Sequence, residues 1–554
     1  MARWTEHEPE HQCRPEAGVG EEAQGPWVVP LFLFFPALVL FFLVGCGAPE
    51  AGESDAEASA PEVPAPTAAH EEHDQATGEA PQELEGLGTV SFPTSCASRV
   101  DDAMQRGVAL LHSFYFSAAR DAFDAAASED PDCAMAHWGM ALAHRGNPFA
   151  GAPAPGADAR GLEAARRALE LDPPTARERG YVDAVIALFD GHETVDWRTR
   201  GARYKAVMEE VARDHPEDVE ATIFFAREIT ALASPADPEF RRQLHAASLM
   251  EPLFEELPRH PGLAHYLIHA YDAPALARRG LAAARAYADI APAAPHALHM
   301  PSHIFTRLGY WEESIETNRR SAEAAGPDSG ERLHAWDYMV YGYLQLGDQV
   351  RADSLVGEAR ALVERVGLDG RLPYNAAAME ARIALESDRW EEAAALEVRT
   401  AADGPPEAVT RFARGLGMAR SGDLSGAREE GVHLARIRDA LEARGEADWA
   451  ERTEAQRLAV EAWILYGEGE SQEALERAER AASIEERVEK HPVTPGPLLP
   501  ARELHGDLLL VLGREAEARA AYEATLEREP NRARTQAALS AAGAAPAADG
   551  RDAR

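Results

Sequence analysis

Two histidine pairs with the same internal spacing stand one repeat length apart in this chain. His265 and His269 are four residues apart, so they share one face of a helix. His299 and His303 repeat that spacing 34 residues later. A period of 34 residues is the length of a unit made of two helices and a turn. The spacing therefore predicts equivalent positions on neighbouring helices, and with them a stack of antiparallel helix pairs.

Composition agrees with an array of helices. The chain has 554 residues, which exceeds a single ordinary core, so it must form several domains or a repeat array. Alanine dominates, aromatic residues are few, and glycine and proline are scattered without a period. These features favour stacked helices over a sheet, and we expect an all-α fold.

Two distant segments share one pattern of small, aromatic and proline positions. A glycine lets two helices approach, an aromatic residue fills the core between them, and a proline ends the unit. The first segment holds Gly107, Ala119, Phe123, Ala126 and Pro131, and the second holds Gly506, Gly513, Ala518, Tyr522 and Pro530. The pattern resembles the tetratricopeptide repeat (TPR). The resemblance implies a TPR-like α-solenoid of stacked antiparallel helix pairs over residues 89–542.

A second resemblance concerns two short sequences. The FPTSC sequence at Phe92–Cys96 and the HMPSHIFTRLG sequence at His299–Gly309 resemble a group of exported bacterial TPR proteins. That group has no firmly assigned activity. The resemblance therefore implies export and a fold, but it names no reaction.

The N-terminus carries an export signal. Trp27–Gly45 is a hydrophobic run, and the Leu-Val-Gly-Cys sequence that ends at Cys46 resembles a bacterial lipobox, in which the cysteine is lipidated. Residues 1–46 are thus predicted to be a signal peptide with a lipidation site. An uncleaved membrane anchor is the alternative, because the preceding segment is acidic and the run is long enough to span a bilayer. Either way we expect a cell-envelope lipoprotein or anchored protein that faces the periplasm or the exterior.

The segments at either end of the solenoid are expected to lack structure. Residues 47–88 are rich in Ala, Pro and Glu and contain no Lys or Arg. Such a segment cannot bury enough apolar surface to fold, so it is predicted to be a disordered tether. Residues 543–554 are predicted to be a disordered tail.

The net charge of the chain and its lack of common catalytic motifs exclude several classes of function. The net charge is −39, which argues against nucleic-acid partners because a phosphate backbone needs a basic face. Outside the predicted leader, where His7–His11 reads HEPEH, the sequence contains no metalloprotease HExxH. It also contains no GxSxG, no P-loop and no dinucleotide-binding GxGxxG. We assign no catalytic residue and expect a binding protein rather than an enzyme.

Cys96 and Cys133 are the cysteines that remain after Cys13 in the leader and Cys46. An exported protein meets an oxidising compartment, where such a pair usually bonds. Cys96 precedes the first helix of a unit and Cys133 follows its second, and a helical hairpin brings those ends together. A disulfide is predicted, with two free buried cysteines as the alternative.

The histidines define the candidate site. Aligned on Gly309, the TPR pattern implies that its first-helix positions face the concave groove of the array. The implied groove residues are His265, His269, His296, His299, His303, His334, Asp337 and Tyr341. Six of the chain's 20 histidines lie between His260 and His303, which composition alone does not explain.

Three interpretations of these histidines stay open. They bind a protein, a peptide or a small ligand in the groove, they hold a metal ion, or they are core and capping residues. For a metal, His265, His269, His299 and His303 would surround one zinc or copper ion. That arrangement requires the helix to begin just before Pro301. We predict a lipid-anchored binding scaffold with a histidine-lined groove, and, as the alternative, a metal-binding protein or metal-dependent enzyme.

Overall fold

The computed structural model describes residues 82–234, 237–366, 374–399 and 403–544. The predictions for the leader, for Cys46, for most of the 47–88 tether and for the tail from 545 lie outside these residues. None of the described helices combines the length and apolar character needed to cross a bilayer.

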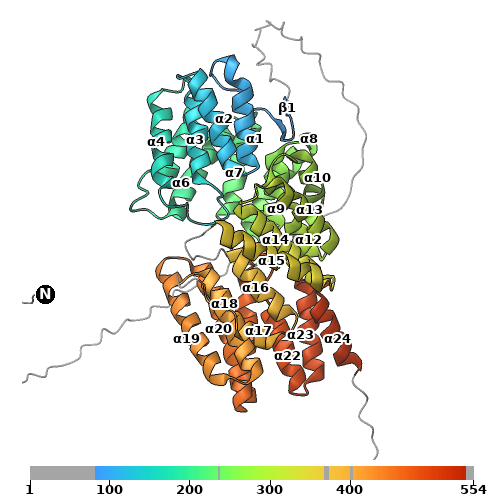
Figure 1. Cartoon of the computed structure of the whole chain (residues 1–554). Coiled ribbons are helices and arrows are strands. Elements are labelled where there is room, and N and C mark those ends of the chain that lie inside the picture. Colours follow the sequence, from blue (N-terminus) through green and yellow to red (C-terminus); the bar gives the residue numbers. More distant parts are fainter. Residues whose placement is uncertain (1–81, 235–236, 367–373, 400–402, 545–554) are drawn as a thin grey trace, which may run out of the picture. The chain divides into compact units, whose positions relative to one another are not determined.

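Almost all of the described elements are helices, and they follow one another as antiparallel pairs (Figure 1). The first six packed pairs and the short elements between them are α1 (Asp101–His112) with α2 (Phe116–Glu129), α3 (Ala134–Arg145) with α4 (Ala157–Glu170), α5 (Ala176–Phe189) with α6 (Trp197–Asp214), α7 (Val219–Ala231) with α8 (Arg241–Glu256), α9 (Pro261–Tyr271) and η2 (Ala277–Gly280) with α10 (Leu281–Ile290), and α11 (Pro295–His299) and α12 (Pro301–Leu308) with α13 (Trp311–Ala324). The later ones are α14 (Gly330–Gln345) with α15 (Gln349–Val366), α16 (Tyr374–Glu386) with α17 (Trp390–Ala394), α18 (Pro405–Ser421) with α19 (Leu424–Ala443), α20 (Ala447–Glu468) with α21 (Ser471–Arg487), α22 (Ala501–Val511) with α23 (Glu515–Arg528), and the closing α24 (Ala533–Ala544). The prediction of an all-α, TPR-like solenoid is confirmed.

The glycines of the repeat pattern lie against its aromatic residues where two helices cross, as the sequence predicts. Gly107 of α1 and Gly139 of α3 both lie against the ring of Phe123, and a Cβ at either would come 2.5 Å from it. Gly506 lies against Tyr522 in the same way, at 2.7 Å. Real side-chain carbons do not approach so closely, so these pairs of helices require glycine where they cross.

A short hairpin precedes the helices and corrects the predicted boundary of the tether. β1 (Gln82–Leu84) pairs antiparallel with β2 (Gly88–Val90), and η1 (Ser98–Val100) follows. Leu87 and Val90 are buried, and the Thr89 amide donates to the Arg259 carbonyl at 3.0 Å. Residues 82–88 were predicted to belong to the disordered segment, but Leu84 and Leu87 pack on the helices, so these residues belong to the folded array.

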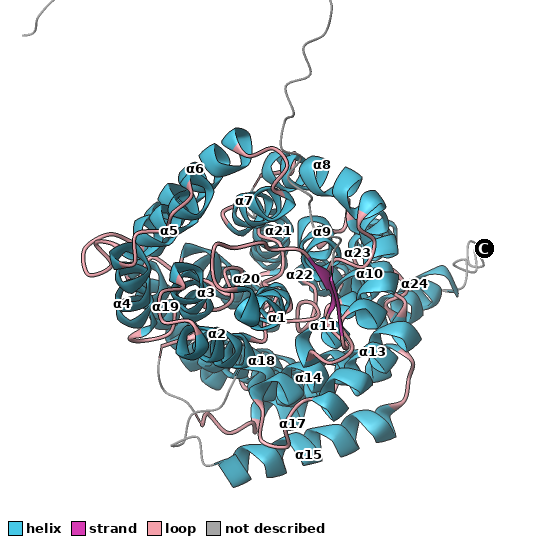
Figure 2. Cartoon of the chain, turned by 90° about the horizontal axis from the view of Figure 1, so that it is seen from above, coloured by secondary structure: helices cyan, strands magenta, loops and turns pink. Residues whose placement is uncertain are grey.

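The array folds back on itself at two places. α1 packs against α9 (Figure 2). In this contact His112 Nδ1 lies 3.1 Å from the Tyr266 hydroxyl. α24 packs against α14, and the Trp311 indole N–H donates to the Asn531 carbonyl at 3.0 Å. In an open solenoid each unit contacts only its neighbours. These extra contacts enclose the inner helices, and that is where the histidines lie.

A centre of six histidines

Four helices bring six histidines into one continuous cluster. His265 and His269 come from α9, His296 and His299 from α11, His303 from α12 and His334 from α14. Each pair on one helix has the spacing of four residues or less that puts both rings on the same side.

Pro301 divides the α11–α12 segment without destroying this face. The helix of His303 begins at Pro301, where no amide donor is needed. Met300 between the two helices keeps helical angles, with φ −52° and ψ −36°. His296 and His299 therefore stay on the same face as His303, as the metal interpretation required.

The first group of three is His265, His269 and His296. One ring nitrogen of each lies within 4.8 Å of the other two. The Nε2 atoms of His265 and His296 are 3.3 Å apart. His269 Nε2 is buried and makes no hydrogen bond.

The second group of three is His299, His303 and His334, whose ring nitrogens also lie within 4.8 Å of one another. His299 Nε2 and His303 Nε2 are 3.0 Å apart. The ring of His334 lies 4.3 Å from that of His299, centre to centre. The two groups are neighbours, because the rings of His269 and His303 are 6.0 Å apart.

Hydrogen bonds on the outer side fix the tautomers of three of these rings. Nδ1 of His265 is 2.6 Å from the His112 carbonyl, and Nδ1 of His303 is 2.8 Å from Asp272 Oδ2. Both partners only accept, so both Nδ1 atoms carry the proton. Nδ1 of His299 donates to Asn318 Oδ1 at 2.6 Å, and the Asn318 amide nitrogen donates to the Ser314 carbonyl. Each neutral ring then presents an unprotonated Nε2 to the cluster.

Two lone pairs consequently face each other in the second group. Neutral His299 and His303 both have their proton on Nδ1, so neither Nε2 can donate across the 3.0 Å that separates them. Two unprotonated nitrogens at that distance repel each other unless a cation stands between or beside them. A metal ion, or a proton on one ring, removes the conflict.

Burial keeps these imidazoles neutral. It is the largest cause that lowers the pKa of His265, His269, His296, His299 and His334 well below the ordinary value, and neighbouring histidines lower it further. The pKa of His303 is also lowered by burial, although its bond to Asp272 opposes the shift. Neutral imidazole is the form that coordinates metals, so the cluster favours a metal over protons.

A buried charge network supports the second group from behind. Asp272 accepts from His303, from Arg307 Nε at 2.9 Å and from Lys490 Nζ at 3.1 Å. Burial alone would raise the pKa of Asp272, but Lys490 and Arg307 hold it well below its usual range. The carboxylate is therefore ionised and orients the His303 ring, as carboxylates behind metal-bound histidines do.

Aromatic side chains wall the cluster. Phe149 stacks on His269 at 3.8 Å, and Phe114 lies edge-on to His265 at 4.4 Å. Tyr338 covers the second group, with its ring 4.8 Å from that of His299. His265, His299 and His303 are buried, whereas His269, His296 and His334 are partly exposed. The three buried rings are therefore closed to a peptide.

The structure modifies the predicted site in three ways. The four histidines predicted to surround one ion are divided between two groups of three, each completed by a histidine assigned only to the groove. Asp337 is buried 3.5 Å from Arg382 Nε and accepts from Asn375, while the Tyr341 hydroxyl accepts from Arg532. These two side chains belong to other contacts, and the predicted open groove finds no support in the burial of the histidines.

Sequence reasoning missed the residues behind the rings. Asp272 and Asn318 carry no motif, and the carbonyl of His112 reaches His265 only because α1 packs on α9. A further group of possible metal ligands already satisfies its own hydrogen bonds; it consists of His112, Glu220 and His260. Glu220 accepts from His112 Nε2 at 2.7 Å and from His260 Nε2 at 2.9 Å, so these nitrogens are already used.

The predicted cysteine pairing is confirmed. Cys96 and Cys133 form a disulfide that joins the start of the first helical unit to its end. Their sulfurs are bonded to each other, so this pair is not a metal site.

Comparisons with known proteins assign this chain no family and no activity. No known family model matches the chain, and no curated protein sequence matches it. Similar solved structures include a human IFIT1 dimer with PPP-AAAA, at 15% identity and TM-score 0.35, covering 60% of this chain and 71% of that one. Yeast Tom70 is similar at 11% identity and TM-score 0.37, over 80% of this chain and 95% of that one. The P58(IPK) TPR domain is similar at 14% identity and TM-score 0.21, over 80% of this chain and 98% of that one.

Proposed function

We propose that this protein is a transition-metal-binding protein whose two groups of three histidines each hold a zinc or copper ion. The observation that carries the proposal is the pair of unprotonated Nε2 atoms of His299 and His303 at 3.0 Å. Three imidazoles and an open position form a coordination shell that suits both metals. Outer hydrogen bonds from Nδ1 to oxygen acceptors are the usual companions of metal-bound histidines.

A histidine-lined groove for a peptide is the weaker candidate. Its histidines would have to reach a partner chain, whereas three of the six are buried and all six rings are covered in part by one another or by aromatic side chains. The partly exposed His269, His296 and His334 suit a water molecule or a small ligand on the metal. Three protein ligands with an open position are typical of catalytic zinc sites, so a metal-dependent reaction is compatible with this proposal.

The test is metal content after loading and dialysis, measured by elemental mass spectrometry. We expect about two ions per wild-type chain, one in His296→Ala, one in His334→Ala and none in the double variant. His245→Ala is the matched control, because that histidine is exposed on α8 away from the cluster. Wild-type protein that keeps no zinc and no copper would contradict the proposal, as would unchanged content in the double variant.

We also propose that the protein is exported and lipid-anchored through Cys46, as its lipobox-like sequence suggests. A Cys46→Ser variant should lose acyl labelling and accumulate as a longer precursor. Equal labelling in that variant would favour the uncleaved anchor.

A further inference from the structure

A basic cleft interrupts this strongly acidic protein. The chain has a net charge of −39, yet one cleft of about 560 Å³ between α2, α3 and α4 is lined by Arg120, His144, Arg145 and Arg160. None of the residues that line it is Asp or Glu. A concentration of like positive charge is costly in a folded protein unless something negative occupies it.

Two of these arginines have no carboxylate partner. Among the described residues, no carboxylate lies within ion-pair distance of Arg120 or Arg160, whereas Arg166 and Arg167 on the same helix α4 pair with Asp190 and Glu170. The absence of partners is therefore a property of the cleft and not of arginines on this helix.

The basic groups are close enough to act together. After burial, the next causes that lower the pKa of His144 are the charges of Arg120 and Arg160, and the opposing effect of Glu163 is smaller than either. Arg145 is buried, and its Nη2 donates to the Gly151 carbonyl at 3.1 Å, which fixes one guanidinium at the base of the cleft. The remaining walls are mostly small residues such as Ala143, Ala154 and Ala157, which leave room for a ligand.

We propose that this cleft binds a compact oxyanion with two or more negative charges, a phosphate or a dicarboxylate. A planar guanidinium group can donate two parallel hydrogen bonds to two oxygens of a phosphate or of a carboxylate. Arg120 and Arg160 carry two positive charges that no carboxylate of the described residues pairs with, so a multiply charged ligand fits better than a monocarboxylate.

The cleft also adjoins the histidine centre. Its edge is the loop between α3 and α4, and Phe149 of that loop stacks on His269. Arg145 holds the same loop through Gly151. An anion on Arg145 would therefore contact the same loop that covers His269. The binding of the anion itself does not depend on the metal.

The test is isothermal titration of the metal-free full chain with inorganic phosphate and with succinate at low ionic strength. We expect a Kd of about 1 mM or tighter for at least one of them, which weakens as salt is added. The double variant Arg120→Gln/Arg160→Gln should bind at least about 10-fold more weakly. Arg203→Gln is the matched control, because Arg203 is exposed on α6 and does not line the cleft.

Each outcome decides the proposal. Tighter binding of phosphate identifies a phosphate ligand, and tighter binding of succinate identifies a dicarboxylate. No binding of either anion to the wild type would overturn the proposal. Equal affinity of the wild type and a double variant shown by circular dichroism to be folded would overturn it as well. Arg160 is exposed and Arg120 only partly buried, so we expect the double variant to fold.

Discussion

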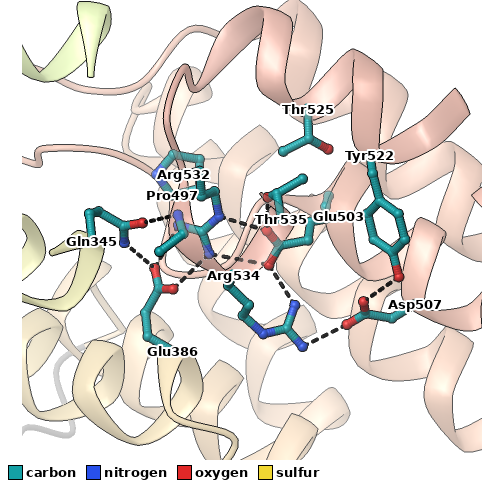
Figure 3. Close-up of polar contacts among 12 residues, drawn as sticks. Gln345, Glu386, Pro497, Glu503, Asp507, Tyr522, Thr525, Arg532, Arg534 and Thr535 are labelled. Carbon is teal, nitrogen blue, oxygen red and sulfur yellow. Dashed lines mark hydrogen bonds and ion pairs between the residues drawn. The ribbon is translucent and has the colours of Figure 1, made fainter. Parts of the chain in front are cut away.

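Arg532 donates to both carboxylate oxygens of Glu386, at 2.6 and 2.9 Å, although 146 residues separate them (Figure 3). The same guanidinium donates to Glu503 of α22 at 2.7 Å. All three side chains are buried. This network joins the segment before α24 to α16 and α22, so it secures the return of the chain's C-terminal end to the middle of the array.

Removing one partner from this network should be costly. In Arg532→Met, two buried carboxylates lose their main cation, and we expect the free energy of unfolding to fall by about 3–5 kcal/mol. Urea titration followed by circular dichroism measures the change. Arg514→Met, which removes an exposed ion pair with Glu517, should leave the midpoint unchanged. An equally small effect at Arg532 would mean that the closure contributes little.

The residues behind the rings should affect metal affinity without touching metal. Asn318→Ala removes the acceptor that holds Nδ1 of His299, and we expect about 10–100-fold weaker binding of one of the two ions. Asn318→Asp keeps an acceptor oxygen and should restore affinity. Competition with a coloured chelator measures both variants. A loss of both ions in Asn318→Ala, or no rescue by aspartate, would contradict this role.

The disulfide should stabilise the first helical unit. Cys96 and Cys133 are 37 residues apart, and closing a loop of that length stabilises a fold by about 3–4 kcal/mol in the chain-entropy description. Replacing both cysteines with alanine should lower the unfolding midpoint, and reducing agent should do the same to the wild type only. Mass spectrometry of unreduced protein should show the linked peptides, and two free thiols in protein from its native compartment would end this prediction.

Glu485 should make stability depend on pH near neutrality. Burial raises the pKa of this carboxyl from 4.5 to about 7. The folded chain therefore holds a proton that the unfolded chain has released, and stability falls as pH rises from about 4.5 to about 7. Glu485→Gln should remove this loss of stability. At pH 8 the loss is at most about 3 kcal/mol, and the partial exposure of the side chain makes it smaller than that.

A control of opposite sign is available on the same helix. Burial raises the pKa of Glu479, but bonds from Arg502 outweigh it and the pKa is lowered. The wild type therefore gains stability as pH rises toward the ordinary carboxyl pKa of 4.5, and Glu479→Gln should lack this gain. Thermal melts from about pH 3 to about pH 8 compare the two variants, and parallel curves for Glu485→Gln and the wild type would contradict the assignment.

Local features of this fold were predictable, and long-range ones were not. The Gly107–Phe123 and Gly506–Tyr522 crossings follow from spacing within one unit, as does the disulfide at the ends of a hairpin. The faces of the histidine helices follow from periodicity alone. By contrast, the division into two groups of three depends on how α9, α11, α12 and α14 pack, which spacing does not determine.

The enclosure of the histidines was also beyond a local pattern. A TPR-like concave face implies an open groove, and that expectation fails where α1 packs on α9 and where Tyr338 reaches the carbonyls of Pro492 and Thr494. These contacts join residues more than 150 positions apart. Asp272 and Asn318 gain their importance only through such packing.

The return of α24 to α14 fixes the number of helix pairs between them. An open array can gain or lose a helix pair at little cost, because each pair recognises only the next one. Here an added or deleted pair between α14 and α24 would carry Arg532 away from Glu386 and Asn531 away from Trp311. The number of units between α14 and α24 is therefore fixed, as the number of blades is in a closed propeller, and related chains should vary in the loops of this stretch.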